Sequence, residues 1–359
     1  MSKSLPYREQ EKIENTQRLR ELLKELPPYV KDFFRAKEQS TSDKSRLSYA
    51  YDLRIFFRFL LENNPALKEK TIPEISISDL ATLGAGDFEE YSEYLKAYSG
   101  PDSRHVTNSR LGISRKMSCL RSFFDYLCKR ELLERNPVRL VDMPKIKDKS
   151  IIQLDPDEVA QLLDYMEDLG KELTGLKLAH YNKQKTRDIA IITLFLGTGI
   201  RVSELVGLNL DDVDFKNDGI RISRKGGNEM IVYFGEEVEN ALLDYLEQTR
   251  NHITALPGHE DALFLSNRRQ RISVDAVEIL VKKYCSAVSL KHITPHKLRS
   301  TYGTALYRET QDIYLVADVL GHSDVNTTKR HYAAIKDSHR RSVRDKVRLR
   351  ESIHETGNL

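Results

Sequence analysis

Cysteine is scarce in this sequence. The chain has three cysteines in 359 residues, and no two of them form a CxxC pair: Cys119, Cys128 and Cys285. An odd number of scattered cysteines provides neither a disulfide framework nor a zinc site. We therefore expect reduced, mostly buried thiols, as in a cytoplasmic protein.

Long apolar runs are also missing. No stretch is long enough to cross a bilayer, so we expect no membrane contact, and residues 1–20 are polar and charged, unlike a signal peptide. The net charge is only +3, so a nucleic-acid surface must come from local clusters of basic residues. The sequence has no carboxylate cluster for Mg²⁺ and no P-loop for ATP, and we expect no cofactor and no metal site.

The chain length predicts two domains, each with its own core. The N-terminal part is expected to be all helical, with helices near residues 10–26, 45–64, 79–99 and 108–132. The last of these carries an apolar stripe at helical spacing, which consists of Ile113, Met117, Leu120, Phe124 and Leu127. Residues 138–153 have little periodicity, a proline and several lysines, as in a linker. We assign an N-terminal domain to 1–145, a linker to 146–154, a C-terminal domain to 155–345 and a tail to 346–359.

The C-terminal part is predicted to combine helices with a small antiparallel sheet. Strands are expected at 212–215, 219–223 and 229–234, and RKGGN (224–228) is a hairpin signal between the last two. Helices are expected near 155–169, 186–199, 236–250, 273–288, 295–308, 312–320 and 324–335. The fold class is therefore mainly α, or α+β.

Four motifs in this part carry polar residues suited to chemistry. They are GTGIRVSEL with Arg201 and Glu204, RKGGN with Lys225, ITPHKLRST with His296 and Arg299, and LGHSDVNTTKRHY with His322 and Tyr332. Each alone has an ordinary interpretation: a surface ion pair, a solvated lysine, a buried capping histidine, and a loop histidine near one tyrosine among many. Together they supply two arginines, a lysine, two histidines and a tyrosine to one domain.

That set of side chains suits the attack on a phosphodiester. The attacked phosphate gains negative charge on its non-bridging oxygens, and two arginines can bind those oxygens without a metal. A tyrosine can be the covalent nucleophile, but its pKa of about 10 means that another group must take its proton or stabilise the phenolate. A histidine can do so, and an acid must protonate the leaving sugar hydroxyl.

With these motifs, the sequence resembles the tyrosine recombinases of the phage-integrase family, and most of all their Xer-type bacterial members. GTGIRVSEL, RKGGN, HKLRST, LGH and the HY of TTKRHY carry the resemblance over residues 155–335. SYAYDLRIFFRFL and RKMSCLRSFFDYLCKRELLERNPV resemble the helices of the family's core-binding, SAM-like domain. The resemblance implies a helical catalytic domain with a small sheet after that domain.

The resemblance also implies a role for each site residue. Arg201 and Arg299 would hold the scissile phosphate, and His322 would hydrogen-bond it. Lys225 would be the general acid for the 5′-hydroxyl, and His296 would assist deprotonation of the tyrosine. Tyr332 would attack and form a 3′-phosphotyrosyl link. Glu204 would support the site without acting in it.

Two positions depart from the family pattern. Ser300 replaces the second histidine of the usual HxLRHT motif, at a position expected to be supporting. Tyr332 lies one residue further from LGH than in the commonest pattern. Tyr302, Tyr307 and Tyr314 are the alternative nucleophiles nearby.

The resemblance further implies what the chain binds. The two domains would close on opposite faces of double-stranded DNA through basic faces at Arg110–Arg121, Arg268–Arg271 and Lys282-Lys283. Four protomers would act on two specific recombination sites, and each would exchange a C-terminal helix with its neighbour. The role would be chromosome dimer resolution in cell division, or integration and excision of a mobile element. In either role the partners could include an accessory protein, which would be a DNA translocase or an excisionase.

Two other functions share parts of this pattern. A type IB topoisomerase uses the same chemistry as a monomer, but the LGH motif and the N-terminal helices argue against it. A non-catalytic DNA-binding regulator would not need a tyrosine beside two arginines, and the retention of all six polar residues argues against that function.

Overall fold

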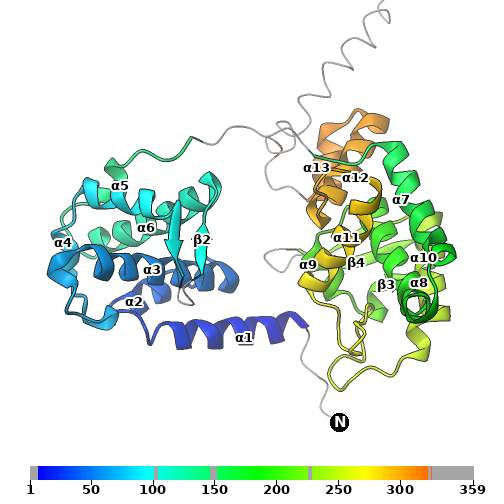
Figure 1. The fold of residues 1–359 in the computed structure, drawn as a ribbon, viewed down its shortest axis with the longest axis horizontal. Helices are drawn as coiled ribbons and strands as arrows, with labels where there is room; N and C mark the ends of the chain where they lie inside the picture. The colour runs from blue at the N-terminus through cyan, green and yellow to red at the C-terminus, as the bar shows by residue number, and fades with distance from the viewer. Residues whose placement is uncertain (1–6, 101–103, 146–151, 225–228, 322–324, 326–359) are drawn as a thin grey trace, which may run out of the picture. The chain divides into compact units, whose positions relative to one another are not determined.

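The computed structural model describes residues 7–100, 104–145, 152–224, 229–321 and residue 325 (Figure 1). The chain divides into two compact units, residues 1–148 and 149–359. The predicted helix at 324–335 and the tail lie outside the described residues, as do Lys225, His322 and Tyr332. No helix in the described part is long and apolar enough to cross a membrane.

The N-terminal unit consists mainly of helices. Its elements are α1 (Tyr7–Leu22), α2 (Val30–Ala36), α3 (Asp43–Asn63), α4 (Ile77–Ala81), α5 (Ala85–Tyr94), β1 (Ala97–Ser99), β2 (His105–Thr107) and α6 (Arg110–Lys129), with short 3₁₀ turns at Pro65–Leu67, Ile72–Glu74 and Pro137–Leu140. Ser42 and Ser109 cap α3 and α6, because their side chains accept hydrogen bonds from backbone amides three residues later.

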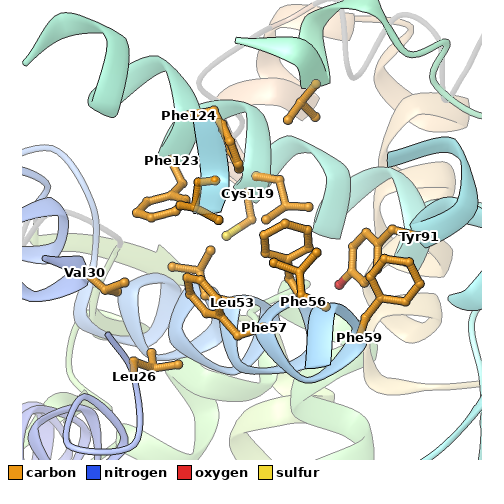
Figure 2. Close-up of a cluster of buried hydrophobic side chains, with 14 of the residues drawn as sticks. Leu26, Val30, Leu53, Phe56, Phe57, Phe59, Tyr91, Cys119, Phe123 and Phe124 are labelled. Atoms are coloured by element: carbon orange, nitrogen blue, oxygen red, sulfur yellow. The ribbon is translucent and has the colours of Figure 1, made fainter. Parts of the chain in front are cut away.

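An aromatic core joins α3, α5 and α6 (Figure 2). Phe56 of α3 packs against Phe88 and Phe124, with ring centroids 5.5 Å and 6.2 Å away. All five residues of the predicted apolar stripe are buried, which confirms the helix and the face that it turns inward. Cys119 is buried in this core and Cys128 is half-buried.

The expectation of an all-helical N-terminal part was wrong at one place. β1 and β2 form a two-stranded antiparallel sheet in which Tyr98 pairs with Val106. Each strand has three residues, and so short a strand gives too few positions for an alternating pattern to stand out. The sequence interpretation also missed α2, a helix of seven residues that follows Pro27-Pro28.

In the C-terminal unit, shorter helices and a sheet are arranged around one long helix. Its elements are α7 (Pro156–Asp168), α8 (Gly175–Thr198), α9 (Val202–Gly207), β3 (Val213–Asp214), β4 (Gly219–Ser223), β5 (Glu229–Tyr233), α10 (Glu236–Gln248), α11 (Val274–Val288), α12 (Pro295–Thr310) and α13 (Ile313–Leu320), with 3₁₀ turns at Leu169–Glu172, Leu210–Asp212 and Arg250–His252. The three-stranded sheet has the order β3-β4-β5 and is antiparallel, as predicted.

Helix α8 is central to this unit. It packs against α7, α10 and α12, and its apolar second half is almost entirely buried. The sequence predicts only that second half, because the first turns, from Gly175 on, are polar and exposed and show no apolar stripe. The helix ends where Gly199 adopts a left-handed conformation (φ +62°), which a glycine adopts without strain.

Candidate active site

Arg201 is the N-cap residue of α9, directly after the turn that ends α8. Its Nη1 lies 2.8 Å from Glu204 Oε1, and Glu204 Oε2 accepts the backbone amide of Arg201 at 2.7 Å. Glu204 is 5% exposed, whereas the Arg201 side chain is 37% exposed. The pair is therefore not a solvated surface ion pair. The buried Glu204 carboxylate fixes one side of the Arg201 guanidinium, and the other side of the guanidinium remains accessible.

Arg299 approaches the same place from α12. It lies on the second turn of the helix, which starts at Pro295 as predicted. Its side chain is buried, and its two terminal nitrogens donate to the carbonyl oxygens of Gly199 and Leu320. Arg299 thus links the end of α8 to the end of α13.

The two arginines meet at the C-terminus of α13. Arg201 Nη2 donates to the carbonyl of Gly321 at 3.0 Å, next to the Leu320 carbonyl that Arg299 contacts. The last carbonyls of a helix lack partners within the helix and carry its negative partial charge, so they attract cations. The structure therefore brings together two of the predicted site residues, which come from separate helices.

His296 lies on the first turn of α12 and is exposed. A buried capping histidine, the ordinary alternative for this position, is therefore excluded. Ser300, at the position of the family's second histidine, donates its hydroxyl to the His296 carbonyl at 3.1 Å. This serine has a local role in the helix.

Lys225, His322 and Tyr332 lie outside the described residues, but the residues that precede Lys225 and His322 do not. Arg224 donates to the carbonyls of Asp318 and Val319, at 3.2 Å and 2.7 Å. Its guanidinium also lies against the Cα of Gly321, where an added Cβ would overlap it. The sequence interpretation missed Arg224, although a second basic residue beside Lys225 in RKGGN was a visible signal.

The three alternative tyrosines differ in exposure. Tyr307 is buried, and burial raises the pKa of Tyr302 above its usual range. A raised pKa makes the phenolate harder to form. Tyr314 on α13 is 63% exposed. Exposure at this position makes Tyr314 the most useful comparison for Tyr332 in an experiment.

The predicted basic faces are partly internal. Arg115 donates to the buried carboxylate of Asp52 at 2.5 Å and 2.8 Å, and Arg121 donates to the carbonyls of Val138 and Val141. Arg271 likewise donates to backbone carbonyls at the end of α9. These three arginines stabilise the fold. Arg115 remains exposed beside Asp52, and the other exposed basic residues on the same segments are Arg110, Arg268, Arg269, Lys282 and Lys283.

The sequence matches the model of the phage integrase family over residues 153–339. It is 35% identical to the tyrosine recombinase XerC of Caldanaerobacter subterraneus subsp. tengcongensis over 89% of this chain and 86% of the relative. The chain belongs to the phage integrase family. Within that family it is of the Xer type, since it is also 30% identical to the tyrosine recombinase XerS of Streptococcus agalactiae serotype III (strain NEM316), over 91% of this chain and 97% of that protein.

The fold agrees with this family. The structure of the XerH site-specific recombinase bound to a palindromic difH substrate superposes with a TM-score of 0.60 and 18% sequence identity, over 87% of this chain and 83% of that one. The mainly helical fold with small antiparallel sheets is thus that of a tyrosine recombinase. Within the described residues, no group of three or more His, Cys, Asp or Glu side chains could hold a metal ion.

Proposed function

We propose that this chain is a site-specific recombinase that cuts and rejoins DNA strands through a covalent 3′-phosphotyrosine link. The observation that supports the proposal most is the meeting of Arg201 and Arg299 on adjacent carbonyls. Two arginines held this close, one against a buried carboxylate and one against backbone oxygens, can bind two oxygens of one phosphate. A helical DNA-binding module has no need of such a pair.

Two proton transfers accompany the proposed cleavage. The Tyr332 oxygen attacks the phosphorus and loses its proton with the help of His296, while the bond to the 5′-oxygen breaks and Lys225 protonates that oxygen. Arg201, Arg299 and His322 stabilise the added negative charge. The phosphotyrosine keeps the bond energy, so attack by a 5′-hydroxyl of the partner strand rejoins the DNA without an external energy source.

The proposed ligand is double-stranded DNA carrying a specific site. The XerH structure holds its difH substrate, and the exposed basic residues Arg110, Arg268 and Lys282 of this chain suit phosphate contacts. We propose that four copies act on two sites, as strand exchange between two duplexes requires. The reaction would serve chromosome dimer resolution or the movement of a mobile element, with an accessory protein in either case.

The test is covalent trapping on nicked DNA. A pool of nicked duplexes with random central sequence is incubated with the protein in EDTA, and covalent adducts are isolated under denaturing conditions and sequenced. Wild-type protein and the Tyr314→Phe control should form adducts on one recurring site. Tyr332→Phe should bind that site and form none. An adduct with Tyr332→Phe would show that another residue is the nucleophile, and no wild-type adduct on any duplex would refute the function.

A further inference from the structure

Three arginines, not two, gather at the C-terminus of α13. Arg299 donates to Leu320, Arg201 donates to Gly321, and Arg224 donates to Asp318 and Val319. The four consecutive carbonyls of residues 318–321, which we name the α13 end, therefore each accept an arginine. Arg224 reaches them from the position directly after β4, in the same unit of the chain.

The carbonyls of the α13 end are suited to accept hydrogen bonds from the three arginines. The last carbonyls of a helix lack the regular amide partner four residues further along, and the aligned peptide dipoles place a negative partial charge there. Arginine suits such a site better than lysine, because its flat guanidinium presents several donors in fixed directions. Arg224 uses two terminal nitrogens on two successive carbonyls.

Gly321 makes room for Arg224. Its backbone is left-handed (φ +59°), which turns the chain sharply after Leu320, and its amide donates to the carbonyl of Asp318 at 2.8 Å. A Cβ at this position would overlap the Arg224 guanidinium. Gly321, the glycine of LGH, is therefore required for two reasons. Its backbone is left-handed, and the Arg224 guanidinium occupies the space that a Cβ would take.

We propose that Arg224 is a positioning residue for the recombination reaction, which fixes the α13 end and through it the guanidiniums of Arg201 and Arg299. This inference rests on the proposed function. Without Arg224, the Asp318 and Val319 carbonyls lose the arginine contact. The Gly321 amide remains on the Asp318 carbonyl, and the space over Gly321 opens. The acceptors of Arg201 and Arg299 at the α13 end are the next residues along the same turn. Each guanidinium therefore keeps its second contact, to Glu204 or to Gly199, but loses a fixed partner at the α13 end.

The structure favours positioning over a direct phosphate contact for Arg224. Its donors already serve the α13 end, and its side chain is half-buried. Burial lowers the pKa of Arg224 from its usual range, and the nearby charge of Arg201 lowers it further, while Glu204 raises it. Arg201 and Arg299 each give the α13 end a single terminal nitrogen, whereas both terminal nitrogens of Arg224 serve it.

The main experiment separates chemistry from DNA binding. Covalent adduct formation is measured at saturating DNA for wild type, Arg224→Ala, Arg224→Lys and the control Arg221→Ala. The control removes an exposed arginine of the preceding strand β4 that is paired with Asp212. Both Arg224 variants should slow the reaction on the order of 10- to 100-fold, since small displacements of catalytic groups have effects of that size. Their DNA affinity and its dependence on salt should match those of Arg221→Ala.

Two results of that experiment would overturn the positioning role. An affinity loss with a salt dependence weaker by about one phosphate contact would make Arg224 a DNA ligand. A wild-type rate in both Arg224 variants would leave it without a part in the reaction. No adduct with wild-type protein would refute the proposed function itself. Failure of the positioning role alone would leave the wild-type adduct in place, so the two failures are distinguishable.

A second measurement tests the contact without activity. Gly321→Ala should lower the melting temperature strongly in the wild-type background and much less in Arg224→Ala, because the overlap is removed with the arginine. Part of the loss should remain, because alanine is strained in the left-handed conformation. Equal losses in the two backgrounds would mean that the residues do not interact, and the proposal would be wrong.

Discussion

Arg201 and Arg299 donate to the carbonyls of two adjacent residues, Gly321 and Leu320. Arg201 precedes the short helix α9, and Arg299 lies inside α12. Neither helix by itself therefore fixes the position of one guanidinium relative to the other. The end of a third helix supplies that relation. A phosphate bound between them would meet two guanidiniums whose spacing is set before DNA arrives, which reduces the cost of ordering them in the transition state.

Lysine substitutions at these two positions test that fixed geometry. Arg201→Lys and Arg299→Lys keep the charge but lose the flat fork, so each should slow covalent adduct formation by about 100-fold at saturating DNA. Arg299→Lys should also lower the free energy of unfolding by about 1–3 kcal/mol, because a buried carbonyl of Gly199 or Leu320 loses its donor. Arg201→Lys should keep an ion pair with Glu204 and remain nearer to wild-type stability. The Arg221→Lys control should be unchanged in both assays, and wild-type rates in the two site variants would contradict the geometry.

The turn at Gly199 supports a second prediction. A Cβ there would lie 2.5 Å from Tyr302 Cδ1 and 3.0 Å from Leu320 Cδ2, in a backbone of φ +62°. Gly175→Ala is a matched control, because Gly175 has φ +56° and nothing within 4 Å of an added Cβ. Both variants carry backbone strain, but Gly199→Ala should unfold with about 1–3 kcal/mol less free energy than Gly175→Ala, because only it overpacks the core. It should also slow adduct formation, since the Gly199 carbonyl accepts Arg299. Equal unfolding curves in urea would rule out the close packing.

Much of this fold was predictable because its strongest elements follow simple periodicities. The α6 stripe and the β4 strand were placed almost to the residue, and Gly199 and Gly321 end α8 and α13 as left-handed glycines usually do. The elements that sequence reasoning missed are short or polar. β1 and β2 have three residues each and no buried side chain, so they leave no pattern. α2 buries Val30, Phe33 and Phe34 at helical spacing, but with seven residues it is too short for the period to stand out.

The candidate site was predictable in composition but not in its contacts. Motif order singled out Arg201, His296 and Arg299 as site residues, yet nothing local to the sequence shows that helix carbonyls hold the two arginines. Arg224 was missed for the same reason, because its partners lie far away along the chain. Arg121 shows the converse, since it was expected on a DNA face and its contacts with the Val138 and Val141 carbonyls assign it to the fold.

Asp125 should make the N-terminal unit sensitive to acid. Hydrogen bonds from Arg139, at 2.7 Å and 2.9 Å, and from Asn136 lower the pKa of this carboxyl below its ordinary value of 3.8, against a smaller effect of burial. The folded state therefore prefers the carboxylate. The stability that this preference contributes is complete above the unfolded pKa and is lost as the pH falls through the lower folded pKa.

The matching variant is Asp125→Asn, compared with wild type by urea unfolding from pH 7 to pH 2.5. Near neutral pH the variant should be less stable by about 1 kcal/mol or less, since the Asp125–Arg139 pair is partly exposed. The difference should stay constant down to about pH 5 and shrink below the ordinary pKa of an aspartate. A difference that grows toward low pH would have the wrong sign for this carboxyl.

Lys225 can be tested as the general acid through the leaving group of the DNA. Lys225→Ala should slow adduct formation by about 100-fold or more on ordinary DNA, because the 5′-oxygen then leaves without a proton. A substrate with sulfur at that bridging position should restore much of the rate, since a thiol has a pKa of about 8.5 and leaves readily as the anion. Lys216→Ala, in the exposed turn between β3 and β4, is the control and should behave as wild type on both substrates. Equal slowing of Lys225→Ala on oxygen and sulfur substrates would assign the proton to another group.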